Sequence, residues 1–247
     1  MKIGIIGGSG LEKLNIFENA QDIEITTQYG SPSSSILKGY IGQHEIFILS
    51  RHGRDHNITP THVNNKANIS VLNDLGCESI IATTATGSLR EEIGIGDIVI
   101  PDQFIDFTKY RETTFFNTFA NGDMKHTSMG DPFNEEIRNK IFSISQKLNI
   151  KTHNKGTIVT IEGPRFSTRA ESKMFRIWGA DIINMSIAPE AILANEIDIP
   201  YAVIAISTDY DSWIEGESPV TMEEVFKVFK TRVNDVTQLL IETILNM

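Results

Sequence analysis

The strongest constraint on the fold of this chain lies in residues 79–88, where a short apolar run is followed at once by hydroxyl side chains and a glycine. Ile80–Ala82 is typical of a buried strand, and Thr83–Ser88 then supplies threonines, a glycine and a serine. In open α/β sheets, ligands bind at the carboxyl ends of such strands. The exposed N–H and O–H groups there suit a small anion such as phosphate. The alternative is an ordinary strand-to-loop turn.

A glycine-rich turn follows the first apolar run of the chain. Lys2–Ile6 has the pattern of a buried strand, and Gly7–Gly10 comes directly after it, with Ser9 inside the turn. The dinucleotide-binding pattern G-x-G-x-x-G is not met, because Lys13 occupies the place of its last glycine. The turn therefore suits either an anion held by Ser9 and the backbone N–H groups, or a merely tight reversal of the chain.

A basic cluster follows the apolar run Ile46–Leu49. Arg51 is suited to a bidentate grip on phosphate, and His52 can donate a hydrogen bond beside it. One alternative is a solvated charged loop. Another is a metal site built from His52, His56 and His62, which is disfavoured because the spacing lacks a helical i, i+4 pair with a carboxylate and no cysteine joins it.

Two carboxylates follow the last apolar strand pattern, Tyr201–Ile206. Asp209 and Asp211 stand just beyond that strand, two positions apart. Partial burial there would raise the pKa of one carboxyl towards the working range of an acid–base group. The alternative is an aspartate that caps the next turn. These residues are the best acid–base candidates in the chain.

Two more strand patterns end in residues suited to a ligand. Gly156–Ile161 leads through the stiff pair Gly163–Pro164 to Phe166, which either stacks on a ring or belongs to the core. Asp181–Met185 is followed by Ser186, which adds a further hydroxyl at a strand end. Together with the preceding segments, they predict one site fed by several strand ends.

Strand and helix patterns alternate along the chain without a linker or an internal repeat, so we predict one α/β domain over residues 1–247. One helix is expected to begin at Thr59, with Pro60 in its first position, and to end before Gly76. The other predicted helices span 134–148, 169–178, 189–196 and 221–245, and further strands are expected at 23–27, 35–38, 45–50, 97–100 and 103–107.

The segment Lys109–Met129 shows no regular periodicity and is rich in aromatic residues, including Phe115, Phe116 and Phe119. A loop of about 20 residues is too long for a simple connector. Exposed aromatic surface of this extent would be a liability unless something covers it. We therefore expect either a lid or a contact between subunits.

Composition excludes several classes of protein. The formal net charge of −10 argues against nucleic acid or an anionic membrane as the main partner. No apolar run approaches the roughly 20 residues that a membrane span requires. The chain starts directly with a strand pattern instead of a signal peptide, and Cys77 is its only cysteine, which rules out an internal disulfide. A reducing cytoplasm fits these features.

Taken in order, these segments resemble the trimeric purine nucleoside phosphorylase superfamily, and within it the enzymes that act on 5′-methylthioadenosine. The match runs over essentially the whole chain and is therefore very specific. The matching motifs are GIIGGSGLE at Gly4–Glu12, SRHGRDH at Ser50–His56, TTATGSLREEIGIGDIVIPDQFID at Thr83–Asp106, GTIVTIEGPRFSTRAES at Gly156–Ser172, WGADIINMS at Trp178–Ser186 and STDYDSW at Ser207–Trp213.

The resemblance implies a fold and a reaction. The fold would be a central mixed twisted β-sheet, partly barrel-like and flanked by helices. The reaction would be phosphorolysis of 5′-methylthioadenosine to adenine and 5-methylthioribose 1-phosphate, with orthophosphate as co-substrate and with no cofactor or metal. By motif match, phosphate would be held by Ser9, Arg51, His52, Thr84, Ala85 and Ser186.

The resemblance also assigns the nucleoside side of the site. The substrate-binding residues would be Phe166 on the base, Met185 on the ribose, and Asp209, Tyr210 and Asp211 around the purine edge. A protonated Asp209 would stabilise the negative charge that the departing purine develops at N7. An aspartate at this position, in place of an asparagine, selects a 6-amino purine.

Specificity and assembly follow from the same resemblance. Met222 and Val225 would line the pocket for the 5′ end of the nucleoside, and Ser167 stands at a further position tied to base choice. His126 would be contributed by the neighbouring subunit of a homotrimer. The alternatives are a phosphorylase of adenosine or methylthioinosine, and a nucleoside-binding protein that has kept the fold and lost catalysis.

Overall fold

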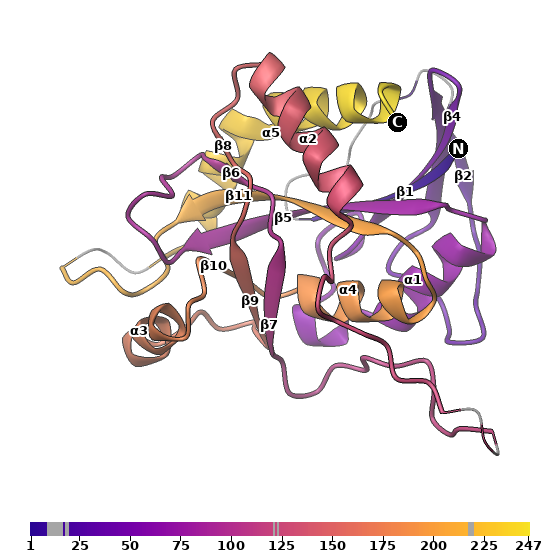
Figure 1. Cartoon of the computed structure of the whole chain (residues 1–247), viewed down its shortest axis with the longest axis horizontal. Coiled ribbons are helices and arrows are strands. Elements are labelled where there is room, and N and C mark those ends of the chain that lie inside the picture. The colour runs from indigo at the N-terminus through magenta and orange to yellow at the C-terminus, as the bar shows by residue number, and fades with distance from the viewer. Residues whose placement is uncertain (9–16, 18–19, 121, 123, 217–219) are drawn as a thin grey trace.

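The long strand β5 (Ser79–Ser88) is the centre of a mixed, twisted β-sheet (Figure 1). It pairs in parallel with β1 and β11, and near its carboxyl end it also pairs antiparallel with β10. The hydroxyl-rich half of β5 therefore emerges between β11 and β10. The computed structural model describes residues 1–8, 17, 20–120, 122, 124–216 and 220–247.

Within the described residues the sheet has 11 strands and branches at β5. The main path runs β2-β3-β4-β1-β5-β10-β9-β7, and a second arm runs from β5 through β11 and β6 to β8. The α/β class and the mixed sheet flanked by helices are confirmed. The remaining strands are β1 (Lys2–Gly7), β2 (Gln21–Ile23), β3 (Ile36–Ile41), β4 (His44–Ser50), β6 (Ile98–Val99), β7 (Gln103–Phe107), β8 (Thr152–His153), β9 (Thr157–Ile161), β10 (Ile182–Asn184) and β11 (Tyr201–Asp209).

Helices cover both faces of the sheet. Alternate residues of β5 point to opposite sides: Ile80 packs in one apolar core and Ile81 in the other. Figure 1 shows α2 and α5 over one face and α1 and α4 over the other. Burial on both faces explains why the central strands are continuously apolar. The helices are α1 (Asn65–Asp74), α2 (Glu135–Lys147), α3 (Arg169–Ile177), α4 (Ile187–Glu196) and α5 (Met222–Leu245).

The helix predicted to start at Thr59 is wrong in its first half. Pro60–His62 forms a short 3-10 turn, the chain is extended at Val63, and α1 begins only after Asn64, whose side chain accepts a hydrogen bond from the Ala67 N–H. The asparagine is the stronger cap because its side chain makes that bond, whereas Thr59 makes none. The predicted stop at Gly76 is confirmed by its positive φ of 79°.

Three other boundaries differ from prediction. Helix α4 starts at Ile187 rather than at Pro189, because a proline is tolerated in the first turn, where its missing N–H has no partner in the helix. Strand β11 continues past Ile206 to Asp209, with an irregularity in its register between Ser207 and Asp209. The strand predicted at 23–27 lies instead at residues 21–23. The first two shifts affect the site described below.

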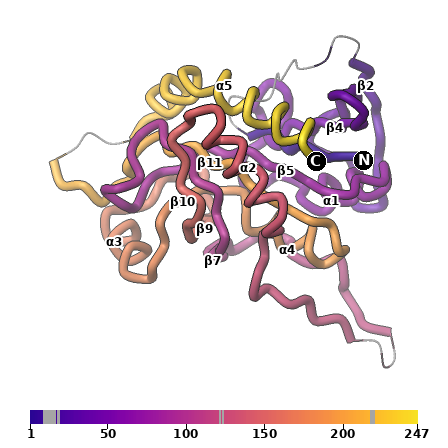
Figure 2. Tube along the Cα trace, turned by 45° about the horizontal axis from the view of Figure 1, so that its top comes forward, coloured from indigo at the N-terminus to yellow at the C-terminus, as the bar shows by residue number. Residues whose placement is uncertain are grey.

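The aromatic segment 109–129 leaves the body of the molecule and extends away from α5 and the C-terminus (Figure 2). Its first part is fastened: the Glu162 carboxylate accepts the N–H groups of Lys109 and Tyr110, and Glu196 accepts that of Phe115. Further along, Phe119 and Met124 are exposed.

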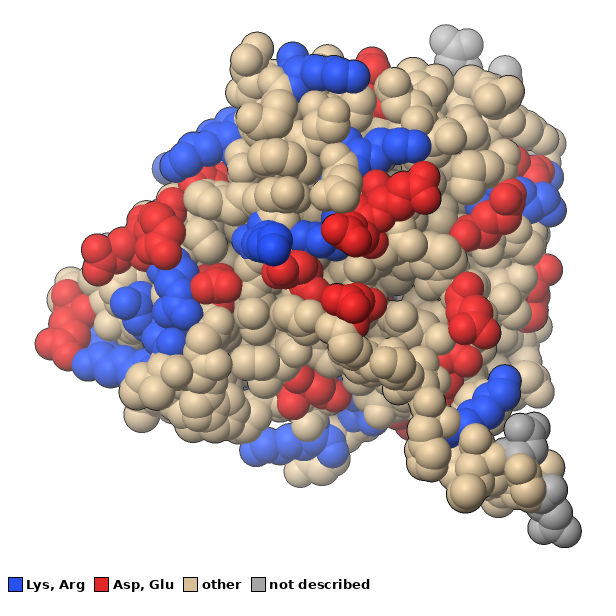
Figure 3. Space-filling view, in the orientation of Figure 1, with Lys and Arg blue, Asp and Glu red and all other residues tan. Residues whose placement is uncertain are grey.

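On the face shown in Figure 3, acidic and basic side chains are interspersed and form no single basic surface. No helix in the described part of the chain is long and apolar enough to cross a membrane.

Candidate active site

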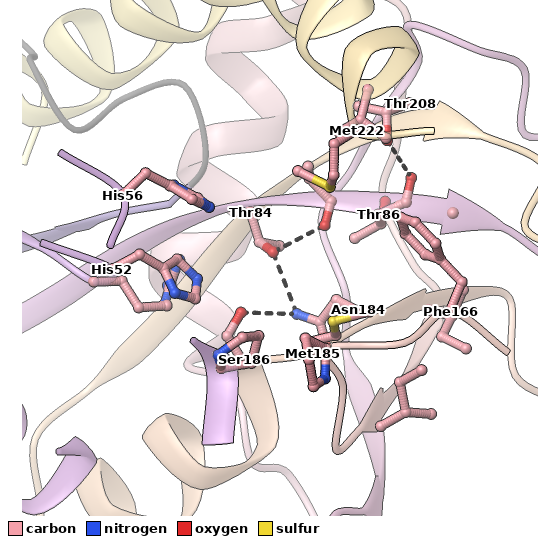
Figure 4. Close-up of a pocket in the computed structure, with 18 of the residues that line it drawn as sticks. His52, His56, Thr84, Thr86, Phe166, Asn184, Met185, Ser186, Thr208 and Met222 are labelled. Atoms are coloured by element: carbon pink, nitrogen blue, oxygen red, sulfur yellow. Dashed lines mark hydrogen bonds between the residues drawn. The ribbon is translucent and has the colours of Figure 1, made fainter. Parts of the chain in front are cut away.

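A cavity of about 380 Å³ lies at the carboxyl ends of β5, β10 and β11. Its wall also includes the segment after β4, the turn after β9 and the start of α5. Ligand pockets typically occupy about 300–1,000 Å³, so the cavity has room for one small molecule of moderate size. Figure 4 shows His52 and His56 on one side of it and Phe166 on the other, with Thr84 and Met185 between them.

The residues predicted for the anion are brought together at one side of this cavity. They come from three separate segments, the loop after β4, the carboxyl half of β5 and the turn after β10. Ser9 lies outside the described residues, so its place in the site stays a prediction. The predicted anion donors that line the cavity are Arg51, His52, Thr84, Ala85 and Ser186.

The start of α4 strengthens this side of the cavity. Ser186 is the N-cap of the helix, yet its hydroxyl makes no capping bond and lies at the cavity wall. The helix N–H groups begin directly behind it. A helix N-terminus favours anions, because its first N–H groups lack partners within the helix and carry partial positive charge. The earlier start of α4 therefore places an anion-binding feature where the sequence predicted only a hydroxyl.

An asparagine that sequence reasoning did not assign connects the strand ends. The Oδ1 of Asn184 accepts a hydrogen bond from the Thr160 hydroxyl at 2.8 Å, which orients its amide group. The Nδ2 then donates to the Thr84 Oγ1 at 3.3 Å and lies 3.5 Å from the Ser186 Oγ (Figure 4). Asn184 therefore holds two of the predicted anion donors in a fixed relation. Its place at the end of a buried strand was the signal for it in the sequence.

Arg51 is fully buried and clamped by a partner on a distant helix. Its Nε and Nη2 donate to the two carboxylate oxygens of Glu190 in α4, and its Nη1 donates to the Thr83 carbonyl at 2.8 Å. The Tyr201 hydroxyl donates to the same carboxylate at 2.7 Å. Sequence reasoning missed Glu190, although it is the only charged residue between Ile187 and Asn195.

The rings of two histidines at the cavity, His52 and His56, pack against each other at a tilt of 38°. The Nδ1 of His52 lies 2.9 Å from the Ile58 carbonyl and must carry a proton to bond it, because a carbonyl oxygen only accepts. The ring of His56 lies 4.8 Å from that of His52 and packs edge-on against Phe226 at 5.8 Å. His56 lines the cavity. Among the described residues, no group of His, Cys, Asp and Glu is arranged to hold a metal ion.

Asp209 and Asp211 line the cavity at the end of β11. Burial raises the pKa of Asp209, and the charge of Glu224 acts in the same direction, against hydrogen bonds from the Asp211 N–H and the Thr208 hydroxyl. Burial likewise raises the pKa of Asp211, with the charge of Asp209 adding to it. Both carboxyls are therefore shifted towards the neutral, proton-carrying form, as a general acid requires.

Gly87 explains how two carboxyls fit so close to β5. A Cβ at this position would lie 2.9 Å from the Asp209 Oδ1 and 3.1 Å from the Asp211 Cβ. Gly87 is also the β5 residue that pairs with Asp209, just after the irregularity in the register of β11. A side chain on residue 87 would push both carboxyls away, so the glycine is required by close approach rather than by its backbone angles.

The rest of the cavity is mostly apolar. Phe166 stands on a turn whose Gly163 has a φ of 68°, and a Cβ on that glycine would meet the Met185 sulfur at 2.5 Å. Val225 is buried and Met222 is partly exposed at the start of α5. The cavity therefore combines a polar side with an apolar one. The predicted nucleoside-binding residues that line it are Phe166, Met185, Asp209, Asp211, Met222 and Val225.

Three further predicted residues do not line the cavity. Ser167 is buried behind Asp211, and its carbonyl accepts a hydrogen bond from the Ser212 hydroxyl. Tyr210 packs edge-on against Trp213 at 6.1 Å. His126 is exposed in the projecting segment, with its ring 5.7 Å from Phe119.

Comparison with known proteins gives a consistent result. Residues 2–246 match the phosphorylase superfamily. The S-methyl-5′-thioadenosine phosphorylase of Xenopus tropicalis is 49% identical over 99% of this chain and 88% of its own length. The enzyme of the same name from Drosophila melanogaster is 45% identical over 99% of this chain and 85% of its own.

Solved structures show the same relationship. The methylthioadenosine phosphorylase of Schistosoma mansoni in complex with adenine has a TM-score of 0.93 and 38% identity, covering 98% of this chain and 90% of that one. A mutant of the adenosine/methylthioadenosine phosphorylase of the same organism, in complex with methylthioadenosine, has a TM-score of 0.92 and 37% identity, with the same coverage.

Proposed function

Because this chain belongs to the phosphorylase superfamily, we propose that it catalyses the phosphorolysis of 5′-deoxy-5′-methylthioadenosine. Orthophosphate replaces adenine at C1′ of the sugar, giving adenine and 5-methylthioribose 1-phosphate. The observation that carries the proposal is one cavity with anion donors on one side and, on another, two buried carboxyls whose pKa values are raised. Its relatives of the same name and the neighbour bound to methylthioadenosine support this substrate.

On the phosphate side, the co-substrate binds to donors from separate strand ends. Arg51, Thr84 and Ser186 supply hydrogen bonds to its oxygens, and the positive N-terminal end of α4 favours its charge. His52 and the backbone of Ala85 complete this set, and Ser9 is assigned to it from the sequence. Anionic phosphate under the sugar then stabilises the positive charge that builds up as the N-glycosidic bond breaks.

On the purine side, Asp209 acts as the acid. The departing adenine develops negative charge, and a proton from the neutral carboxyl of Asp209 to N7 stabilises it. Asp211 meets the same edge of the base, and Phe166 stacks on its face. An aspartate suits a 6-amino purine, because the wrong base would leave a buried polar group without a partner.

The 5′ end of the nucleoside meets the start of α5. Met222, Val225 and Phe226 form an apolar wall there, which suits a methylthio group better than a hydroxyl. A relative described as an adenosine/methylthioadenosine phosphorylase shows that the two activities occur together in this family. Adenosine is therefore the second candidate substrate, and methylthioinosine is disfavoured by Asp209.

Assembly and location belong to the same proposal. The enzyme works as a homotrimer in the cytoplasm, needs no cofactor or metal, and receives His126 from a neighbouring subunit at the open side of the site. The exposed Phe119 and Met124 around His126 support a subunit contact, because large apolar side chains are seldom left in water together. Ser167 and Tyr210 act from behind the site by supporting Asp211 and its loop.

The experiment is purine release from methylthioadenosine, adenosine and methylthioinosine, each with and without orthophosphate. We expect adenine to appear only with phosphate and fastest from methylthioadenosine. Release that does not need phosphate would make the protein a hydrolase and contradict the roles of Arg51, His52 and Thr84. Hypoxanthine from methylthioinosine as the main product would contradict the role of Asp209.

A further inference from the structure

The guanidinium of Arg51 is fixed by three neighbours before any ligand arrives. Glu190 holds the Nε and Nη2 edge, and the Thr83 carbonyl accepts Nη1 at 2.8 Å. A Cβ on Gly8 would lie 2.5 Å from Nη1, so the Gly8 backbone closes that side. The planar group therefore has one orientation available to it at the cavity wall.

Glu190 is itself held in place from a different element. Its side chain is completely buried, and its Oε2 accepts both the Arg51 Nη2 at 2.9 Å and the Tyr201 hydroxyl at 2.7 Å. Tyr201 is the first residue of β11, the strand that ends at Asp209. The chain Tyr201–Glu190–Arg51 thus links the start of that strand to the anion side of the cavity.

Helix α4 couples Glu190 to a second anion donor. Ser186 and Glu190 are four residues apart at the start of the helix, and such residues lie on one face. Ser186 lines the cavity while Glu190 clamps Arg51. One rigid turn of helix therefore sets the positions of two phosphate-binding groups from different parts of the sequence.

Stability alone is a weak reason for this buried ion pair. Burying two charges costs several kcal/mol per ion on a rough scale, and apolar residues of similar volume often replace such pairs without loss of stability. The pair nevertheless lies at the anion side of the cavity, where orientation of the guanidinium decides whether its N–H groups meet phosphate oxygens. The location favours a positioning role.

We propose that Glu190, aligned by Tyr201, is the positioning residue that sets the orientation of Arg51 for phosphate. This inference rests on the proposed function, which assigns phosphate to Arg51. The negative charge of Glu190 opposes phosphate binding, whereas its alignment of the guanidinium promotes it. The two effects predict opposite changes in the KM for phosphate when Glu190 is altered, so the sign of the change separates them.

The test compares Glu190→Gln and Tyr201→Phe with the unmodified protein. In Glu190→Gln the amide offers one oxygen in place of two. Whichever way it is turned, its N–H₂ group faces at least one N–H group of the guanidinium, donor against donor, so the guanidinium must rotate. We expect the KM for phosphate to rise about tenfold to a hundredfold. The equilibrium binding of adenine without phosphate should change less than about twofold, since the altered ion pair does not contact the base and distant sites act nearly independently.

Tyr201→Phe alters the alignment without altering any charge. It keeps the buried ring and removes the hydroxyl that donates to Glu190, so a smaller rise in the KM for phosphate, about twofold to tenfold, is expected. The matched control is Asp181→Asn, which weakens the Arg90–Asp181 ion pair away from the cavity. The control should lower thermal stability and leave the KM for phosphate unchanged.

A second readout does not depend on turnover. Phosphate that binds the native state raises its melting temperature, and this rise should be present in the unmodified protein and reduced in both variants. A fall in the KM for phosphate in Glu190→Gln would overturn the proposal, because charge would then outweigh alignment. Parallel rises in the constants for phosphate and adenine would also overturn it, as they indicate general damage. Absence of any phosphate effect in the unmodified protein would instead contradict the proposed function.

Discussion

The pKa of Asp209 links its role in the reaction to its effect on stability. Burial favours its neutral form in the native state, whereas in the unfolded chain it ionises near its ordinary pKa of 3.8. As the pH rises through the interval between these two pKa values, the unfolded state loses its proton first and the free energy of unfolding falls. At neutral pH the buried Asp209 carboxyl therefore lowers the free energy of unfolding.

Asp209→Asn tests this relationship. The amide can keep the bond from the Asp211 N–H to its oxygen, and its N–H₂ can donate to the Thr208 hydroxyl in place of the bond it now receives. Without an acid, kcat should fall about 10²- to 10⁴-fold. The melting temperature at neutral pH should stay equal or rise, measured by calorimetry. A large loss of both activity and stability would show that the carboxylate is structural.

Single residues were predictable where they stand directly at a strand end. Asp209 and Thr84 each follow an apolar run, and a local pattern is enough to find them. Glu190 was not predictable in this way, because its partner Arg51 is 139 positions away and only the fold brings them together. Its one signal was a charged residue within an apolar helix, where a carboxylate needs a partner.

At the scale of elements, Thr160 in strand β9 links that strand to the neighbouring strand β10 and to helix α4. Its buried hydroxyl donates to Asn184 in β10 and accepts the Ala188 N–H at the start of α4. Thr160→Val keeps the shape and leaves both partners unsatisfied, at a cost of about 1–3 kcal/mol for each. We expect lower stability in urea denaturation and weaker phosphate binding, because Asn184 and α4 both shape the anion side. If the variant is destabilised but binds phosphate as before, Thr160 stabilises the fold and has no part in phosphate binding.

Element types were predicted better than their starting points. The apolar stripe of residues 134–148 gave α2 almost to the residue. The start at Thr59 was wrong because the chain offers two possible N-cap residues five positions apart, Thr59 and Asn64. Only the Asn64 side chain accepts a hydrogen bond from a helix N–H group.

At the scale of the whole molecule, Glu162 ties the projecting segment to the body. Burial alone would raise its pKa, yet bonds from the Lys109 N–H, Arg111 and Thr61 outweigh it and hold the pKa at about 2. Because the pKa of Glu162 is lower in the native state than its ordinary value of 4.5, its ionised carboxylate stabilises the native state at pH values above 4.5. This stabilisation is lost as the pH falls from 4.5 to about 2. In Glu162→Gln, acid unfolding followed by circular dichroism should show a shallower loss of stability in that interval. An identical acid profile would show that these bonds do not hold the segment.

The exposed end of the same segment is the subunit contact that we propose. Phe119 is 46% and Met124 72% exposed, and the ring of Phe119 lies 5.7 Å from that of His126. If a second copy covers them, Phe119→Asp should disrupt the assembly, because a buried unpaired charge is strongly unfavourable. Sedimentation should then show a smaller species. A matched substitution at another exposed apolar residue, Tyr40→Asp on strand β3, should leave the assembly intact.

The proposed role of His126 makes this a test of the site as well. A site completed by a neighbouring subunit should lose nucleoside affinity when the assembly is broken, so Phe119→Asp and His126→Ala should both raise the KM for methylthioadenosine. Phosphate binding, assigned to residues that one chain supplies, should change far less. A monomeric variant with an unchanged KM for the nucleoside would show that one chain holds the complete site, and that the aromatic segment serves assembly alone.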